Sequence, residues 1–229
     1  PSVDLTVYGG YTRGLEEFGT APENAANGVE PVPASKTEQL DAGIRYRISP
    51  GLNLMAGVFQ VNKPYFDRNT ANIYTDVGNL RHRGIEMSLA GQPAEGLTIV
   101  AGAVFLQARV SGLSVDQGLI GDVPPGTPPS ITRINVQYEI PNWRGFSIDT
   151  QLESTGSHYA NRLNTLRVPP TAILSLGVRY PFAALGAKAN LRVQVQNVTN
   201  AYDWKVDGAS GRFSPIGARN FTVKLAADF

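Results

Sequence analysis

Apolar and polar residues alternate one by one along many segments of this chain. In residues 220–229, NFTVKLAADF, the residues Phe221, Val223, Leu225, Ala227 and Phe229 fall on one face, and mostly polar residues fall on the other. Successive side chains of a β-strand point to opposite faces, so the pattern predicts a strand with one apolar and one polar side. Free chain ends fray, so a segment that keeps this pattern up to a final aromatic residue is expected to be held in a sheet.

The same period of two predicts about ten antiparallel strands and an all-β chain. Two of them, 52–62 and 97–109, are apolar on both faces, and the pattern leaves their register ambiguous. The predicted strands are residues 2–12, 36–48, 52–62, 73–90, 97–109, 132–140, 146–153, 171–180, 188–196 and 220–229.

The gaps between these strands are alternately short and long. The short gaps are 49–51, 92–96, 141–145 and 181–187, and the long ones are 13–35, 63–72, 110–130, 155–170 and 198–219. Several long structureless loops are uncommon in a compact soluble domain. Outer-membrane barrels have short turns at the periplasmic rim and long loops on the extracellular side. The alternation therefore predicts part of a transmembrane β-barrel, with the terminal strand running toward the periplasm.

Aromatic residues are placed as two belts at a lipid interface would be. One group lies beside the short turns and the chain end, and a second lies near the long gaps. The first comprises Tyr46, Tyr138, Trp143, Phe146, Tyr180, Phe182 and Phe229, and the second comprises Tyr11, Tyr65, Phe66, Tyr74, Phe105 and Tyr159.

Composition excludes several kinds of function. The 229 residues include no cysteine, which excludes disulfides and thiolate sites. With 20 Lys and Arg against 19 Asp and Glu, the net charge of +1 gives no electrostatic reason to expect a nucleic-acid partner. His82 and His158 lie in different segments, and nothing around them indicates a metal site or a resident cofactor. The chain begins in a predicted strand with no signal peptide or initiator Met, so we expect a part of a longer protein.

Five motifs occur in order along the chain. Residues 8–14, YGGYTRG, are followed by residues 56–63, AGVFQVNK, and by residues 73–89, IYTDVGNLRHRGIEMSL. Residues 195–202, VQNVTNAY, and residues 214–229, SPIGARNFTVKLAADF, complete the set. Together the five motifs resemble TonB-dependent outer-membrane receptors, the siderophore receptors in particular. The third motif resembles the family's strand with R-G-[IV]-E, the fourth looks like its V-x-N-[LV]-x-[ND]-x-x-Y segment, and the fifth is similar to its closing strand, which ends in Phe. The first two motifs fit the same template.

The resemblance implies that residues 1–229 are the carboxy-terminal portion of a barrel of about 22 strands, without the plug domain and the first strands. It implies a bacterial outer-membrane receptor, not an enzyme, that binds a ferric siderophore and imports it in a TonB-dependent way. Iron would enter only as part of the siderophore. The implied partners are the siderophore, the TonB complex through the plug region, outer-membrane lipid and the barrel-assembly machinery.

Arginine and aromatic side chains of the outer loops are the expected contacts for a bulky, often anionic ferric siderophore. The candidates are Tyr65, Phe66, Arg68, Tyr74, Tyr159, Arg162, Trp204 and Arg212. Phe221 and Phe229 are the candidate residues for barrel closure and the assembly signal.

Two other classes of protein fit part of the pattern. A passive porin would share the barrel but would need no plug. A soluble β-sandwich binding module would share the two-faced strands, but their polar faces would then be the solvent faces on nearly every strand.

Overall fold

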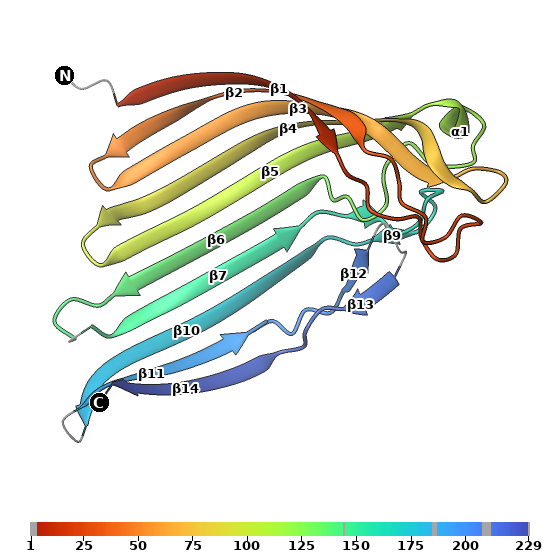
Figure 1. The fold of residues 1–229 in the computed structure, drawn as a ribbon. Coiled ribbons are helices and arrows are strands. Elements are labelled where there is room, and N and C mark those ends of the chain that lie inside the picture. The colour runs from red at the N-terminus through yellow and green to blue at the C-terminus, as the bar shows by residue number, and fades with distance from the viewer. Residues whose placement is uncertain (1–3, 144, 185–186, 208–211, 229) are drawn as a thin grey trace.

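The computed structural model describes residues 4–143, 145–184, 187–207 and 212–228, which form one large antiparallel sheet and a few short elements (Figure 1). The sheet has ten strands in the order β1-β2-β3-β4-β5-β6-β7-β10-β11-β14, so each strand pairs with the nearest long strand in the sequence. These are β1 (Leu5–Glu16), β2 (Ser35–Ser49), β3 (Leu52–Arg68), β4 (Tyr74–Ala94), β5 (Leu97–Ser111), β6 (Ser130–Glu139), β7 (Ser147–Thr155), β10 (Thr171–Ala184), β11 (Ala187–Gln196) and β14 (Asn220–Asp228).

All ten predicted strands are confirmed over the residues that the structure describes, with residues 2–3 and 229 outside them. The alternation of short and long gaps corresponds to the two ends of the sheet. The short turns gather at one end of the sheet, and the connecting loops gather at the other, which we call the loop end (Figure 1). Small elements lie in these loops: the ribbon of β8 (His158–Tyr159) and β9 (Arg167–Val168), the ribbon of β12 (Trp204–Asp207) and β13 (Arg212–Pro215), and helix α1 (Leu113–Asp116). No helix among the described residues has the length and apolar character to cross a membrane.

One predicted gap is wrong. Residues 63–72 were expected to form a long loop, but β3 continues to Arg68 and β4 begins at Tyr74. The two strands stay paired to their tips, with a bulge between Tyr65 and Phe66, so they form a tall hairpin with a short connection. The sequence pattern did not predict this extension, because the alternation of apolar and polar residues stops at Lys63-Pro64.

Registers show which side chains share a face, and they settle the two ambiguous strands. Val58 pairs with Ile85, and Ile85 pairs with Phe105, so these residues lie on one face. This face is the apolar one, and its side chains remain exposed: Val58 is 55%, Ile85 49% and Phe105 52% accessible. The described residues form no second sheet layer over it, which excludes a β-sandwich and agrees with a surface made for lipid. We call this surface the outer face.

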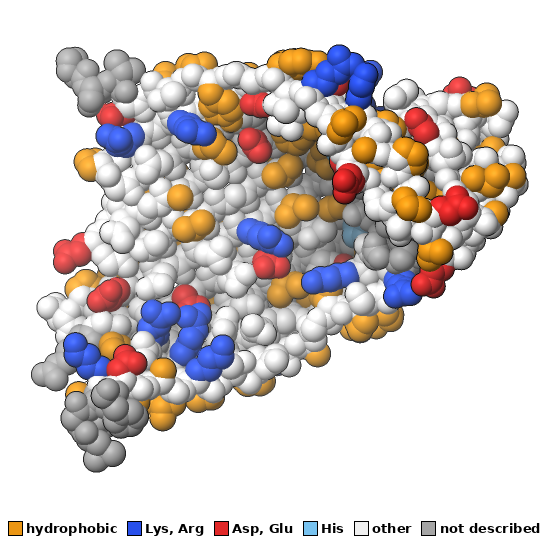
Figure 2. Space-filling view, in the orientation of Figure 1, with side chains coloured by type: hydrophobic (Ala, Val, Ile, Leu, Met, Phe, Trp, Pro, Cys, Tyr) orange, Lys and Arg blue, Asp and Glu red, His pale blue; other side chains and the backbone are white. Residues whose placement is uncertain are grey.

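The opposite surface, the inner face, is polar, as predicted. Lys, Arg, Asp and Glu side chains are mixed over the sheet in Figure 2, and Arg192 lies 3.1 Å from Asp149. Tyr8 lies across Gly43 and Gly57, with the Arg45 guanidinium 5.4 Å from its ring centre. The aromatic ring therefore fills space that two glycines leave open on neighbouring strands.

The aromatic belt at the short turns forms a chain of rings. Trp143 contacts Phe146 at 5.4 Å between ring centres, Phe146 contacts Tyr180 at 6.4 Å, and Tyr180 contacts Phe182 at 6.0 Å. At the other edge of the apolar band only part of the predicted belt is on the surface. Tyr11 and Phe105 are exposed, whereas the loop-end aromatics of β3 and β4 pack among the loops.

Candidate ligand site at the loop end

The tall hairpin of β3 and β4 supports a cavity of about 470 Å³ at the loop end. Five of the eight predicted contact residues line it: Tyr65, Phe66, Arg68, Tyr74 and Arg162. Asp67 of β3 also lines the cavity. The loop after β1, the loop between β5 and β6, the loop after β8 and strand β13 complete the lining with Pro22, Asn24, Pro124, Pro125, Ala160, Asn161, Leu166 and Phe213.

Arg162 connects the loop after β8 to the hairpin tip, 94 residues earlier in the chain. Its Nη2 donates to the carbonyl oxygen of Arg68 at 2.7 Å, and its Nε lies 3.5 Å from Oδ2 of Asp67. The Asp67 side chain is only 14% exposed. A carboxylate so sheltered needs a charged partner, so the role of Arg162 here is to hold two loops together.

Two asparagine side chains connect further segments, because each side-chain amide bonds both the backbone N–H and the backbone C=O of one distant residue. The Asn27 amide accepts from the Tyr74 backbone N at 2.8 Å and donates to the Tyr74 carbonyl at 3.1 Å. The Asn164 amide does the same with Val123, at 2.9 and 2.8 Å. Because each amide satisfies a donor and an acceptor of a neighbouring loop, the cavity walls are held without regular secondary structure.

Aromatic rings form the wall of the cavity next to the sheet. Phe66 lies 4.7 Å from Phe18 and 6.2 Å from Tyr74 between ring centres. Tyr65 packs against the small buried cluster of Leu80, Ala108, Val110 and Ile120. This part of the hairpin lies beyond the apolar band, and here burial, helped by the Asp67 carboxylate, raises the pKa of the Tyr65 hydroxyl. Tyr65 therefore stays neutral at every physiological pH.

Arg68 is the cation that remains available in the cavity. Its backbone N–H bonds Oδ1 of Asp67 and its carbonyl accepts from Arg162, but its guanidinium makes no hydrogen bond or ion pair with the described residues. A guanidinium beside aromatic rings and prolines can pair with an anionic group and stack on a flat one.

A further ion pair joins β3 to the last residue of β1 near the loop end. Lys63 Nζ lies 2.6 Å from Oε1 of Glu16 and 5.6 Å from the ring centre of Phe18. Burial opposes the ionisation of Glu16, but the hydrogen bonds from Lys63 and Thr37 outweigh it and hold the pKa of this carboxyl below its usual value.

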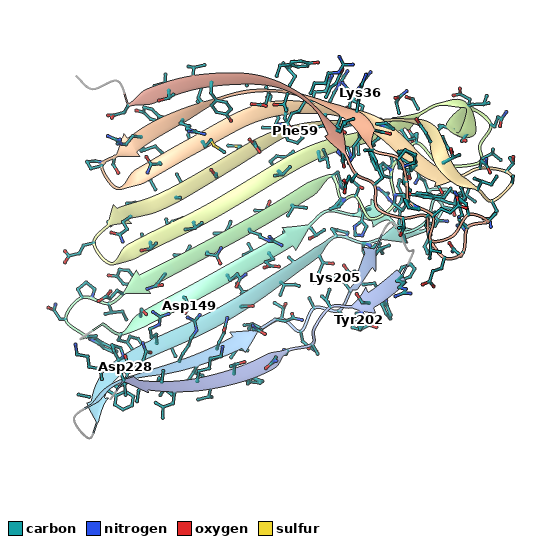
Figure 3. All side chains as sticks on the ribbon, in the orientation of Figure 1. Lys36, Phe59, Asp149, Tyr202, Lys205 and Asp228 are labelled. Carbon is teal, nitrogen blue, oxygen red and sulfur yellow. The ribbon has the colours of Figure 1, made fainter. Side chains whose placement is uncertain are left out.

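The three other predicted contact residues lie outside this cavity. Tyr159 lines a separate cavity of about 290 Å³ and lies under the Arg167 guanidinium at 5.5 Å. Trp204 makes edge contacts with Phe213, which does line the main cavity, and with Tyr202, labelled in Figure 3. Arg212 is exposed on β13, in register with Asp207.

The sequence reasoning missed Asp67 and Phe213. Asp67 lies in a predicted gap without a motif of its own, and its partner Arg162 is too distant in the chain for any motif to link them. Phe213 sits on a short ribbon that the period of two did not reveal. The pair Pro124-Pro125 was a visible loop signal that could have directed attention to this wall.

Of the two predicted closure residues, Phe221 is on the outer face of β14, 71% exposed, and pairs with Val195. Phe229 lies outside the described residues. In the part of the chain that the structure describes, no group of three or more His, Asp or Glu side chains could hold a metal ion.

Comparisons with known proteins agree with this geometry. Residues 1–201 match the family described as TonB dependent receptor-like, beta-barrel. The ferrichrome receptor FcuA of Yersinia enterocolitica is 29% identical over 174 residues, 75% of this chain and 23% of that protein. The ferrioxamine receptor of the same species is 24% identical over 172 residues, 74% of this chain and 24% of that protein. This chain thus spans about a quarter of the length of these relatives.

Solved structures show the same fold. The ferric preacinetobactin receptor BauA of Acinetobacter baumannii superimposes with a TM-score of 0.79 at 24% identity, over 99% of this chain and 34% of that one. The ferric yersiniabactin uptake receptor FyuA of Yersinia pestis gives a TM-score of 0.78 at 18% identity, over 99% of this chain and 35% of that one. With a family match over most of its length, this chain belongs to the TonB-dependent receptor β-barrel family of the bacterial outer membrane.

Proposed function

We propose that this chain forms the loop-bearing part of an outer-membrane receptor that binds a ferric siderophore and imports it in a TonB-dependent way. The carrying observation is the loop-end cavity, where the Arg68 guanidinium has no hydrogen-bond or ion-pair partner among the described residues and lies among aromatic side chains. Relatives named as ferrichrome and ferrioxamine receptors support the ligand class. The iron is cargo inside the chelate, and the protein moves the complex without making or breaking a bond.

The residues of the cavity take different roles in this proposal. Arg68 pairs with an anionic or carbonyl-rich part of the chelate, while Phe66 and Tyr74 contact its apolar or flat parts. Arg162 and Asp67 keep the walls in place. Trp204, Tyr159 and Arg212 lie beside the cavity and are proposed as outer contacts. Energy would reach the receptor from the TonB complex through a plug region.

Binding and uptake of ferric siderophores by the full-length gene product test the proposal. Ferrichrome and ferrioxamine are the first ligands to use. Without Arg68 the chelate loses a charge-assisted contact worth about 1.5–3 kcal/mol, so we expect Arg68→Ala to weaken binding by tenfold or more. Arg13→Ala is the matched control, because Arg13 is at the loop end but pairs with Glu38 at 3.2 Å and does not line the cavity.

Uptake by cells separates the receptor from a passive porin. We expect uptake of the labelled chelate to stop when a protonophore collapses the proton gradient, since TonB-dependent transport consumes that gradient. Uptake that continues at the same rate would identify a diffusion pore. The proposed function is wrong if the full-length gene product binds no ferric siderophore. The proposed site is wrong if a ferric siderophore binds and Arg68→Ala does not weaken its binding.

A further inference from the structure

The outer face of β3, β4 and β5 changes from apolar to basic close to the loop end. The row Val58, Ile85 and Phe105 is apolar and exposed. Two residues further along the strands, Gln60 pairs with Arg83 and Arg83 with Gln107; after two more, Asn62 pairs with Arg81 and Arg81 with Arg109. Directly paired residues share a face, so three arginines stand in two rows immediately beyond the apolar band.

Two of these three arginines bond neutral amides and not carboxylates of the described residues. Arg83 Nε donates to the Gln60 amide oxygen at 2.9 Å, and Arg81 Nε donates to the Asn62 amide oxygen at 3.2 Å. Among the described residues, neither Arg81 nor Arg83 forms an ion pair, and the partners of both Nε atoms are neutral amides. Only Arg109 has an acidic partner, Oδ2 of Asp122 at 3.1 Å, and that pair is about half exposed on both sides. The amides use Nε and leave the terminal NH2 groups of Arg81 and Arg83 free to bind an anion.

Two adjoining hollows on the surface show the same change from apolar to basic side chains. One, of about 680 Å³, is lined on the outer face by Leu40, Ala42, Val58, Ile85 and Phe105, with Gln60, Arg83 and Gln107 at its polar end. The other, of about 390 Å³, is lined by Asn62, Asn79, Leu80, Arg81, Arg83, Gln107, Arg109 and Ser111. Arg83 and Gln107 belong to both hollows, so an apolar groove leads directly into a basic one.

We propose that this combined groove binds one phosphate-bearing lipid of the leaflet on the loop side. Its acyl chain occupies the hollow over Val58, Ile85 and Phe105, and its phosphate lies between Arg81, Arg83 and Arg109. The position is appropriate, because the end of the apolar band is where headgroups begin. Guanidinium groups bind phosphate oxygens in pairs, and a lipid-facing basic pocket selects anionic headgroups. The site is separate from the loop-end cavity and does not depend on the proposed cargo.

Lipid binding to the full-length gene product in non-ionic detergent tests this proposal. The probes are lipid A, which carries phosphate and acyl chains, and the same lipid after enzymatic removal of its phosphates. Native mass spectrometry counts the bound lipids. We expect the wild type to retain phosphorylated lipid A at least about tenfold more strongly than the dephosphorylated form, given the strength of hydrogen bonds to charged groups.

The triple variant Arg81→Gln, Arg83→Gln and Arg109→Gln should lose that preference. The matched control is Arg179→Gln, Lys188→Gln and Lys224→Gln, which removes the same charge from the inner face. Val58→Trp keeps the surface apolar but fills the groove, so it should weaken binding of phosphorylated lipid A as well. Heat-modifiable migration on a gel confirms that each variant is folded, and the single variants Arg81→Gln and Arg83→Gln replace the triple one if it is not.

Three outcomes would overturn the proposal. Equal retention of the two lipid forms by the wild type would mean a nonspecific lipid shell. An unchanged preference in the outer-face variants would place the lipid elsewhere. Displacement by inorganic phosphate at an equal concentration would reveal a simple anion site without an acyl-chain groove.

Discussion

At the scale of single residues, the inner face depends on glycines that make room for a ring. A Cβ on Gly43 would lie 2.5 Å from the Ala56 carbonyl oxygen and 2.5 Å from the Tyr8 hydroxyl. Real Cβ atoms do not approach so closely, so either the Tyr8 ring or the neighbouring strand has to move. The same ring also covers Gly57, one strand further. Tyr8 therefore couples three adjacent strands.

We expect Gly43→Ala to destabilise the folded protein by about 1–3 kcal/mol, the range for overpacking. Gly14→Ala is the control, because it is also a strand glycine on the inner face but has open space where its Cβ would stand. The temperature at which the full-length gene product loses its heat-modifiable migration measures the effect. Equal temperatures for the two variants would contradict the role given to Tyr8.

Residue identity alone did not predict the contacts between residues of the loop-end cavity. The fold brings five predicted contact residues into the lining of one cavity: Tyr65, Phe66, Arg68, Tyr74 and Arg162. Their roles were not evident, because the Arg162–Asp67 contact joins loops far apart in the sequence. An aromatic residue or an arginine in a loop indicates a contact. Only the tertiary structure shows whether that contact is with another loop or leaves the side chain available to a ligand.

At the scale of elements, the strands were predictable wherever two environments constrain them. Lipid on one side and a polar interior on the other enforce strict alternation, as in β11 and β14. Beyond the apolar band this constraint ends. The tip of the β3–β4 hairpin, helix α1 and the β8–β9 and β12–β13 ribbons were missed there, since they are fixed by contacts between loops and not by a period in the sequence.

The assignment of faces makes a direct prediction for β4. Met87 is on the outer face, 45% exposed and paired with Ala56 and Ala103, whereas the adjacent Ser88 faces inward. We expect Met87→Arg to destabilise the protein in lipid vesicles by about 2–4 kcal/mol, the cost of arginine near the bilayer midplane. Ser88→Arg should cost much less. Denaturant titration in vesicles measures the free energy of unfolding of both variants. A larger loss of stability in Ser88→Arg than in Met87→Arg would contradict this assignment of the outer and inner faces.

At the scale of the whole molecule, the described sheet is open. The strand β1 pairs only with β2, and β14 pairs only with β11, so each presents one edge without a described partner (Figure 1). Unpaired N–H and C=O groups in hydrocarbon cost several kcal/mol each, which makes two open edges incompatible with a lone sheet in a bilayer. The outer face is nevertheless apolar from β1 to β14, where Val7 is 72% and Val223 68% exposed. A lipid-facing surface and unpaired edges together require further strands on both sides.

We therefore expect that residues 1–229 alone do not insert as a folded monomer. The outer face directs them to lipid, but the edges of β1 and β14 would stay unpaired, so the chain should aggregate or remain unfolded. The measurement is heat-modifiable migration and protease resistance after refolding into lipid vesicles. The full-length gene product, refolded in the same vesicles, is the control and should show both properties. A protease-resistant, heat-modifiable monomer of residues 1–229 would mean that β1 and β14 can pair with each other, and the sheet would then close as a ten-stranded barrel of its own.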